Sequence, residues 1–141
     1  RFNSVYDHPE RSLKRYSQHR FLISPEYSTF ADMDLWRQIE STGKNRWVGA
    51  YWQNKGLSVV PAICWSTPRS YEFCFDGVEA RSIVAVGMIE CKAQKKAFLH
   101  GYDAMLERVN PSAIIILGTP FSEMRGNIVP VEYQFNGKGG C

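Results

Sequence analysis

Three continuous apolar stretches divide the chain and predict its buried strands. They span residues 57–64, 82–89 and 113–117, and the first is rich in β-branched side chains. Unbroken apolar runs are typical of strands buried on both faces, as in a parallel sheet covered by helices. Shorter runs at residues 20–24 and 127–133 predict a first and a last strand.

Apolar residues at helical spacing occupy the segment between the last two long runs. They predict a helix over residues 93–109. Asn110 and Pro111 end it, because a residue that precedes proline disfavours helical backbone. Another helix is predicted near residues 9–17, with Pro9 in its first turn.

Two further helical stretches are expected between the first two strands. The first begins at Asp32 or Asp34, both suitable N-cap residues, and is interrupted by Gly43. The second covers residues 45–54. Apolar helix faces must be buried, so we expect the tryptophans of both stretches in the core. These tryptophans are Trp36, Trp47 and Trp52.

The alternation of strands and helices predicts a single α/β domain. We expect a mostly parallel sheet of about four or five strands, flanked by helices and connected by right-handed crossovers. The domain is predicted to cover residues 1–135, and the glycine-rich residues 136–141 are expected to form a flexible tail.

One segment fits two assignments. In residues 71–76, aromatic and other side chains alternate as in a strand. The segment between two parallel strands, however, requires a crossover, which is usually helical. Both assignments stay open at this stage.

Composition agrees with a folded intracellular domain. The 141 residues are 44% hydrophobic and 22% charged, which excludes a disordered chain. No apolar run is long enough to cross a bilayer, so no membrane partner is expected. The four cysteines show no CxxC spacing, which favours a reduced, cytoplasmic compartment over a zinc ribbon or a disulfide framework.

Several short phrases, taken together and in order, resemble one family. They are SPEYS at 24–28, AYWQ at 50–53, VPAICW at 60–65, FCFDG at 73–77, SIVAV at 82–86, FLHGYDAM at 98–105 and NPS at 110–112. In this order they resemble the bacterial, phage and plasmid family catalogued as domain of unknown function 4417. The resemblance covers most of the chain and implies a cytosolic protein of a phage or mobile element, without an established activity. Glu26 stands where that family tends to carry Asp.

This family context favours a role in nucleic-acid metabolism or in phage–host conflict. An alternative from a different class is a non-catalytic module that binds or inhibits a host or phage protein. Neither role requires an enzyme, and the sequence leaves the question of catalysis open.

Polar residues follow the predicted strands at their carboxyl ends, which is where ligands bind in open parallel sheets. We expect them to form a pocket for a nucleotide or for the end of a DNA or RNA strand. The candidates are Glu26, Ser28, Trp65, Ser66, Thr67, Glu90 and Lys92. Trp65 would stack on a base. The alternative is that the serine caps a turn and the tryptophan belongs to the core.

The triplet Glu90-Cys91-Lys92 also resembles the metal site of the PD-(D/E)XK nucleases. In that arrangement Asp76, which lies 14 residues before Glu90, would approach it through a hairpin. The two carboxylates would bind Mg²⁺ while Lys92 orients the attacking water. No other cofactor is predicted. The alternative is a surface salt bridge at an exposed strand end.

A basic cluster near the N-terminus is a third candidate site. Arg11, Lys14 and Arg15 share one face of the predicted helix, where they would contact phosphates. The net charge of +3 is too small to require a nucleic-acid partner, and a solvated helix face is the alternative.

Overall fold

The computed structural model describes residues 3–27, 29–88 and 91–132 of the chain. The first half contains α1 (Asn3–Asp7), α2 (Pro9–Tyr16), β1 (Leu22–Ile23), α3 (Leu35–Asn54), β2 (Val59–Val60) and the short 3₁₀ helix η1 (Pro68–Glu72). The second half contains β3 (Ile83–Gly87), the 3₁₀ helix η2 (Cys91–Gln94), α4 (Lys95–Val109), β4 (Ala113–Leu117) and β5 (Ile128–Val131). None of the helices in these ranges is both long and apolar enough to cross a membrane.

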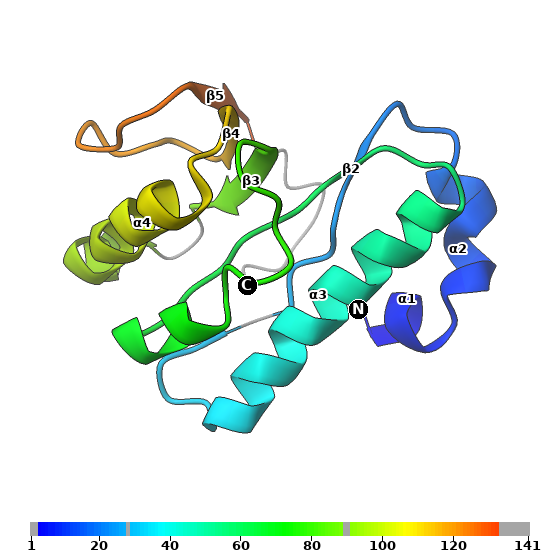
Figure 1. The fold of residues 1–141 in the computed structure, drawn as a ribbon, viewed down its shortest axis with the longest axis horizontal. Helices are drawn as coiled ribbons and strands as arrows, with labels where there is room; N and C mark the ends of the chain where they lie inside the picture. Colours follow the sequence, from blue (N-terminus) through cyan, green and yellow to red (C-terminus); the bar gives the residue numbers. More distant parts are fainter. Residues whose placement is uncertain (1–2, 28, 89–90, 133–141) are drawn as a thin grey trace.

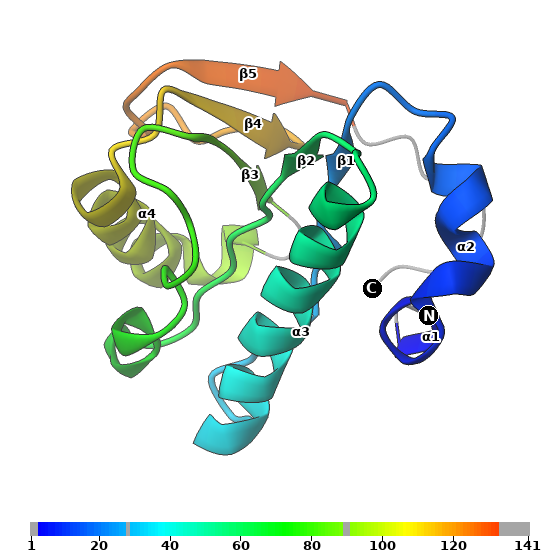
Figure 2. The same cartoon turned by 45° about the vertical axis from the view of Figure 1, so that its right-hand side comes forward.

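All strand pairs in the described residues are parallel, which confirms the predicted α/β fold. β1 pairs with β2, while β3, β4 and β5 form a second sheet in that order. A single bridge between Ala62 and Ala85 connects the two sheets, and backbone hydrogen bonds of 2.9 Å accompany it. The strands therefore follow one another in space as they do along the chain (Figures 1 and 2).

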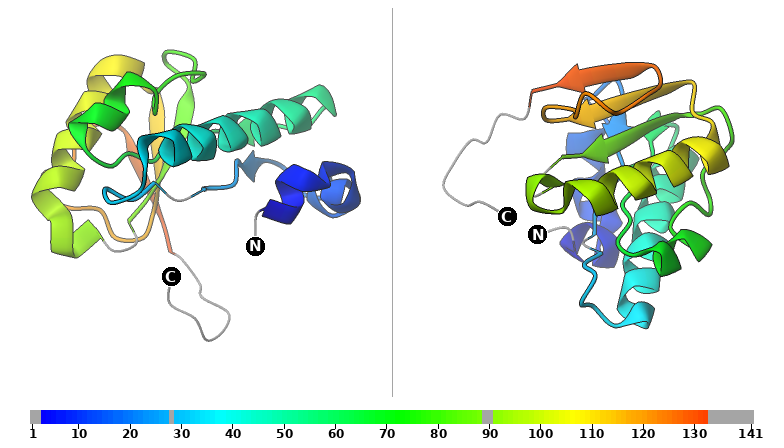
Figure 3. Two further views of the ribbon diagram at one scale, coloured as in Figure 1. Left: turned by 90° about the horizontal axis from the view of Figure 1, so that it is seen from below. Right: turned by 90° about the vertical axis from the view of Figure 1, so that its left-hand side faces the viewer.

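The long helices cover one face of this sheet. Val84 and Ile114 pack against α4, and Leu22 packs against α3. Because the strand order never reverses, crossovers of one handedness place both helices on the same side (Figure 3). The prediction that the strands are buried on both faces is confirmed only in part for the second sheet: Ala85, on the face opposite Val84, is buried, whereas Ile83 and Val129 on that face are exposed.

Gly43 does not interrupt the segment between β1 and β2, which is one 20-residue helix, α3. A glycine inside a helix costs only about 1 kcal/mol. Val48 and Trp52 of α3 are buried against Val5 of α1 and Leu22 of β1, and this burial offsets that cost. Of the three tryptophans expected in the core, only Trp52 is buried.

The other two tryptophans of α3 are accessible to solvent. Trp36 is 61% exposed beside Arg37, and Trp47 is 46% exposed between the rings of Tyr6 and Tyr51. Ile39 of the same helix is also exposed, so α3 keeps apolar residues in contact with water. Spacing alone did not distinguish the buried face from this outer one.

Residues 71–76 form neither a strand nor an α-helix. The 3₁₀ helix η1 ends at Glu72, and turns occupy the residues up to Gly77. The turns direct Tyr71, Phe73 and Phe75 toward the core between α4 and the second sheet. This packing accounts for the alternating aromatic residues without a strand. The crossover from β2 to β3, residues 61–82, thus contains a 3₁₀ helix and turns but no α-helix.

Candidate functional site

A cavity of about 410 Å³ opens where the carboxyl ends of the strands meet the start of α4. Its lining comes from the segment after β1, the segment after β2, the last residues of β3 and the first turn of α4. The lining residues are Glu26, Thr29, Phe30, Ala31, Asp32, Ile63, Cys64, Trp65, Ser66, Val86, Gly87, Gln94, Ala97 and Phe98. Parallel strands bring these segments together because their carboxyl ends share one edge.

Three polar side chains in the cavity form a chain of hydrogen bonds. Thr29 Oγ1 lies 2.9 Å from Cys64 Sγ, and the thiol also bonds the carboxylate of Glu26. Burial and the negative charge of Glu26 raise the pKa of Cys64 to about 12. The thiol is therefore neutral near pH 7 and donates its proton to the carboxylate.

The Glu26 carboxylate is held against the end of β3. Its Oε2 atom lies only 3.3 Å from the position that a β-carbon on Gly87 would occupy. Although the residue as a whole is open to solvent through the cavity mouth, burial of the carboxylate raises its pKa above the usual 4.5. The hydrogen bond from Cys64 opposes this shift in part. A carboxylate with a raised pKa in a cavity is a recurrent feature of functional sites.

We expect Glu26→Gln to stabilise the fold at neutral pH. A pKa that folding raises means that ionised Glu26 destabilises the folded state, and this cost grows as the pH rises through the folded pKa. Thermal unfolding at pH 4 and pH 7 tests this. The gain in Tm should appear at pH 7 and vanish at pH 4, where the native carboxyl is neutral. A loss of Tm at pH 7 would show that the ionised carboxylate stabilises the fold.

The hydroxyl of Ser66 has a fixed direction. Gln38 is buried and its Nε2 donates to the carbonyl of Met33 at 2.9 Å, so its Oε1 must face Ser66. Ser66 Oγ then donates to that oxygen at 2.6 Å. The proton of Ser66 is used inside the protein, and its lone pairs remain on the cavity side as acceptors.

Comparison with known proteins gives the family of the chain. A family model described as "Domain of unknown function (DUF4417)" matches residues 1–135. The chain belongs to the DUF4417 family. The resemblance that the sequence phrases indicated is thereby confirmed.

The curated relatives of this DUF4417 domain are phage proteins. It is 34% identical over 121 residues to the Gene 1 protein of Mycobacterium phage L5, an alignment that covers 84% of this chain and 53% of that protein. It is also 34% identical over 121 residues to the Gene 1 protein of Mycobacterium phage D29, covering 84% and 45% respectively. The chain thus spans about half the length of these relatives. No solved structure matches it.

The DUF4417 domain brings part of the predicted pocket together. Glu26, Trp65 and Ser66 all line the cavity, whereas Thr67 is exposed at the start of η1 and does not. Ser28 and Glu90 lie outside the described residues, as does the side chain of Lys92. The binding and catalytic roles of these residues stay predictions.

Trp65 has mainly a core position. It is 8% exposed, its Nε1 donates to the carbonyl of Phe98 at 3.2 Å, and its ring packs against Phe75 and Tyr102. Only part of its ring borders the cavity. Phe30, which is 52% exposed at the mouth, is better placed to stack on a ligand.

The hairpin required by the nuclease hypothesis is absent from the described residues. Asp76 lies in the turns before β3, where its carboxylate forms an ion pair with the guanidinium of Arg108, with 3.6 Å between Oδ1 and Nη2. Glu90 follows the opposite end of that strand. Among the described residues, no group of three or more His, Cys, Asp or Glu side chains is arranged to hold a metal ion. The expected hairpin is therefore wrong for the described residues. The Mg²⁺ site of Asp76 and Glu90 itself stays a prediction, because Glu90 lies outside them.

The basic cluster of α2 does not adjoin the cavity. Arg11, Lys14 and Arg15 are exposed, so they remain available to phosphates. The chain runs from α2 to the amino end of β1, whereas Glu26 follows its carboxyl end. None of the three lines the cavity.

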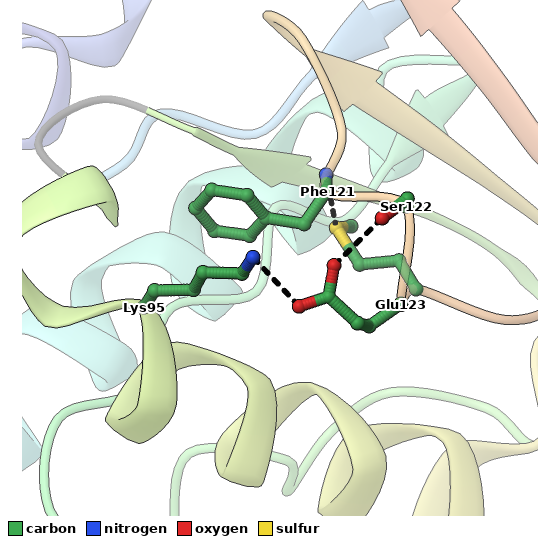
Figure 4. Close-up of polar contacts among 5 residues, drawn as sticks. Lys95, Phe121, Ser122 and Glu123 are labelled. Atoms are coloured by element: carbon green, nitrogen blue, oxygen red, sulfur yellow. Dashed lines mark hydrogen bonds and ion pairs between the residues drawn. The ribbon is translucent and has the colours of Figure 1, made fainter.

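Lys95, the first residue of α4, binds the loop after β4 (Figure 4). It is not among the residues that line the cavity. Lys95 Nζ forms an ion pair of 2.7 Å with Glu123 and lies 5.0 Å from the centre of the Phe121 ring. Hydrogen bonds from Lys95 and Ser122 lower the pKa of Glu123. The charge of Lys95 is thus engaged by Glu123, and the charged side chains that line the cavity in the described part of the chain are Glu26 and Asp32.

Sequence reasoning missed Thr29 and Cys64 as members of the site. Apolar residues surround Cys64 in sequence, and that pattern alone favours a small core residue. Its position at the carboxyl end of the predicted strand 57–64 would have identified it as a site residue, because Glu26 follows the carboxyl end of the predicted strand 20–24. Arg46 of α3 was missed as well: its guanidinium donates to the carbonyls of Ala62, Cys74 and Asp76.

Proposed function

We propose that this DUF4417 domain binds a nucleobase in the cavity at the carboxyl edge of its sheet. The base would belong to a nucleotide or to the end of a DNA or RNA strand, and the protein would act in phage nucleic-acid metabolism in the host cytoplasm. The observation that carries the proposal is the Glu26 carboxylate, which lines an open cavity with the Cys64 thiol as its donor partner.

The size and lining of the cavity support this ligand class. A volume of about 410 Å³ lies in the usual range for small-molecule sites. Phe30 and Phe98 supply flat apolar surface, on which a base can stack. Protein sites read extruded bases with this combination of stacking and hydrogen bonds to the base edge.

The charges of the lining indicate which part of a nucleotide enters. Glu26 and Asp32 line the cavity, and no Lys or Arg whose side chain the structure describes does so. A phosphate would be repelled there, whereas the N–H groups of a base would find acceptors. The base therefore enters the cavity and the phosphate stays outside it.

Binding of nucleoside monophosphates by isothermal titration calorimetry tests the proposal. We expect Glu26→Gln to weaken binding by about 10- to 100-fold, because a hydrogen bond to a charged group contributes about 1.5–3 kcal/mol. Glu107→Gln is the matched control, since Glu107 is exposed on α4 and does not line the cavity. It should bind as the native protein does.

The absence of binding by any of the four common nucleotides and by short single strands would contradict the proposal. The alternative of a protein-interaction module would then gain weight. The exposed apolar side chains on the open face of the second sheet favour that alternative.

A further inference from the structure

Three polar groups of the cavity, Thr29, Cys64 and Ser66, keep their protons within the protein, while the carboxylate of Glu26 presents acceptors to a ligand. Thr29 bonds Cys64, and Cys64 directs its proton to Glu26. Ser66 donates to Gln38, whose own orientation is fixed by its bond to Met33. The part of the cavity around Glu26 and Ser66 therefore favours a ligand edge that carries donors, and the amide of Gln94 in the same lining can donate or accept.

A carboxylate has about four acceptor positions on its two oxygens. The thiol of Cys64 occupies one of them, so both oxygens of Glu26 retain capacity for a ligand. Two parallel N–H groups on adjacent ligand atoms match this pair of oxygens, as the two N–H groups of an arginine do.

The four common bases differ in this respect. Guanine alone has two neighbouring donors on its Watson–Crick edge, the N1–H and the exocyclic N2–H₂. Adenine and cytosine each place an acceptor nitrogen beside their amino group, and that nitrogen would face a carboxylate oxygen. Uracil and thymine have one N–H between two carbonyl oxygens. Apposing two acceptors leaves buried polar groups unpaired, which is a strong basis for rejection.

We propose that the cavity is selective for guanine, with the two oxygens of Glu26 accepting the N1–H and N2–H groups of the base. This inference rests on the proposed nucleobase-binding function and adds its specificity. Ser66 Oγ, which also lines the cavity, supplies a further acceptor, and Phe30 would cover one face of the base. Asp32 at the cavity lining disfavours a phosphate in place of the base.

The experiment compares guanosine, inosine and adenosine in calorimetric titrations of the native protein. Inosine lacks only the N2 amino group of guanosine, so it measures the second donor alone. We expect inosine to bind about 10-fold more weakly than guanosine, and adenosine about 100-fold more weakly. Glu26→Gln should reduce the preference for guanosine to a few-fold, because an amide offers one acceptor and one donor.

Glu26→Asp keeps the charge but retracts the carboxylate, so it should weaken guanosine binding while preserving the order of the three nucleosides. Circular dichroism establishes that each variant is folded. Equal binding of guanosine and adenosine would overturn the guanine inference and leave the nucleobase function intact. Failure of all three nucleosides and of all four nucleotides to bind would overturn both. Retention of the guanosine preference in folded Glu26→Gln would show that another group reads the base.

Discussion

Gly101→Ala is expected to destabilise the domain by about 3 kcal/mol, although the same change stabilises most helices. A methyl group at position 101 would lie 2.1–2.7 Å from three ring atoms of Trp65, which no side chain can tolerate. Trp65 cannot move away, because Phe75, Phe98 and Tyr102 surround its ring. Either α4 separates from the sheet or Trp65 leaves its hydrogen bond to Phe98.

Urea unfolding measures this effect, and Gly43→Ala is the matched control. Gly43 lies inside α3 with no atom within 4 Å of the position that a β-carbon would take. That substitution should stabilise the domain by about 1 kcal/mol, since it removes only the helix cost of glycine. Opposite signs for the two glycines are therefore the prediction. Stabilisation by Gly101→Ala would show that α4 packs differently from the arrangement described here.

Arg46→Ala is expected to cost a similar amount, about 3 kcal/mol, through lost hydrogen bonds to backbone carbonyls. The guanidinium of Arg46 donates to the carbonyl of Cys74 at 2.7 Å and to that of Asp76 at 2.8 Å. A weaker bond of 3.3 Å reaches the carbonyl of Ala62. One side chain of α3 thus holds the segment after β2 and the turns before β3, and burial lowers its pKa without neutralising it.

Arg37→Ala serves as the control, because Arg37 is an exposed residue of the same helix whose guanidinium lies over the exposed ring of Trp36. Its removal should change the free energy of unfolding by less than about 0.5 kcal/mol. Arg46→Lys should rescue little of the loss, since an ammonium cannot reach carbonyls in three directions as a planar guanidinium does. Equal effects of Arg46→Ala and Arg37→Ala in urea unfolding would contradict this structural role.

The parts of the fold that were predictable are those that local patterns determine. The apolar runs around Val84 and Ile115 identified parallel strands because a strand covered by neighbours needs no polar alternation. The helix that ends at Val109 was recognisable from Asn110, which adopts a left-handed conformation with φ of 48° at its C-terminus. Both signals act over a few residues.

The parts that were not predictable depend on contacts between distant segments. Whether Gly43 breaks a helix depends on how well the rest of α3 packs, and that is decided by strands on either side of it in sequence. The sequence likewise does not show which tryptophan of α3 faces the sheet. The 3₁₀ helix η1 is stabilised by Ser70, whose hydroxyl accepts from Ser66 and donates to Thr67.

The candidate site divides in the same way. The rule that ligands bind at the carboxyl edge of a parallel sheet predicts Glu26 and Ser66 in one pocket, and both line the cavity. The direction of the Ser66 proton depends on Gln38, and the shifted pKa of Glu26 depends on burial beside Cys64. Ser66 lies 28 residues from Gln38 in the sequence, and Cys64 lies 38 residues from Glu26. Such separations exceed the range of any local sequence pattern.

Binding of a nucleobase by Glu26 in the cavity at the carboxyl edge can be observed residue by residue. Titration of the ¹⁵N-labelled protein with guanosine, followed by amide chemical shifts, measures it. We expect the largest shifts at Glu26, Thr29, Ser66 and Gly87, with loss of these shifts in Glu26→Gln. Shifts confined to α2, or to the open face of β4 and β5, would contradict it.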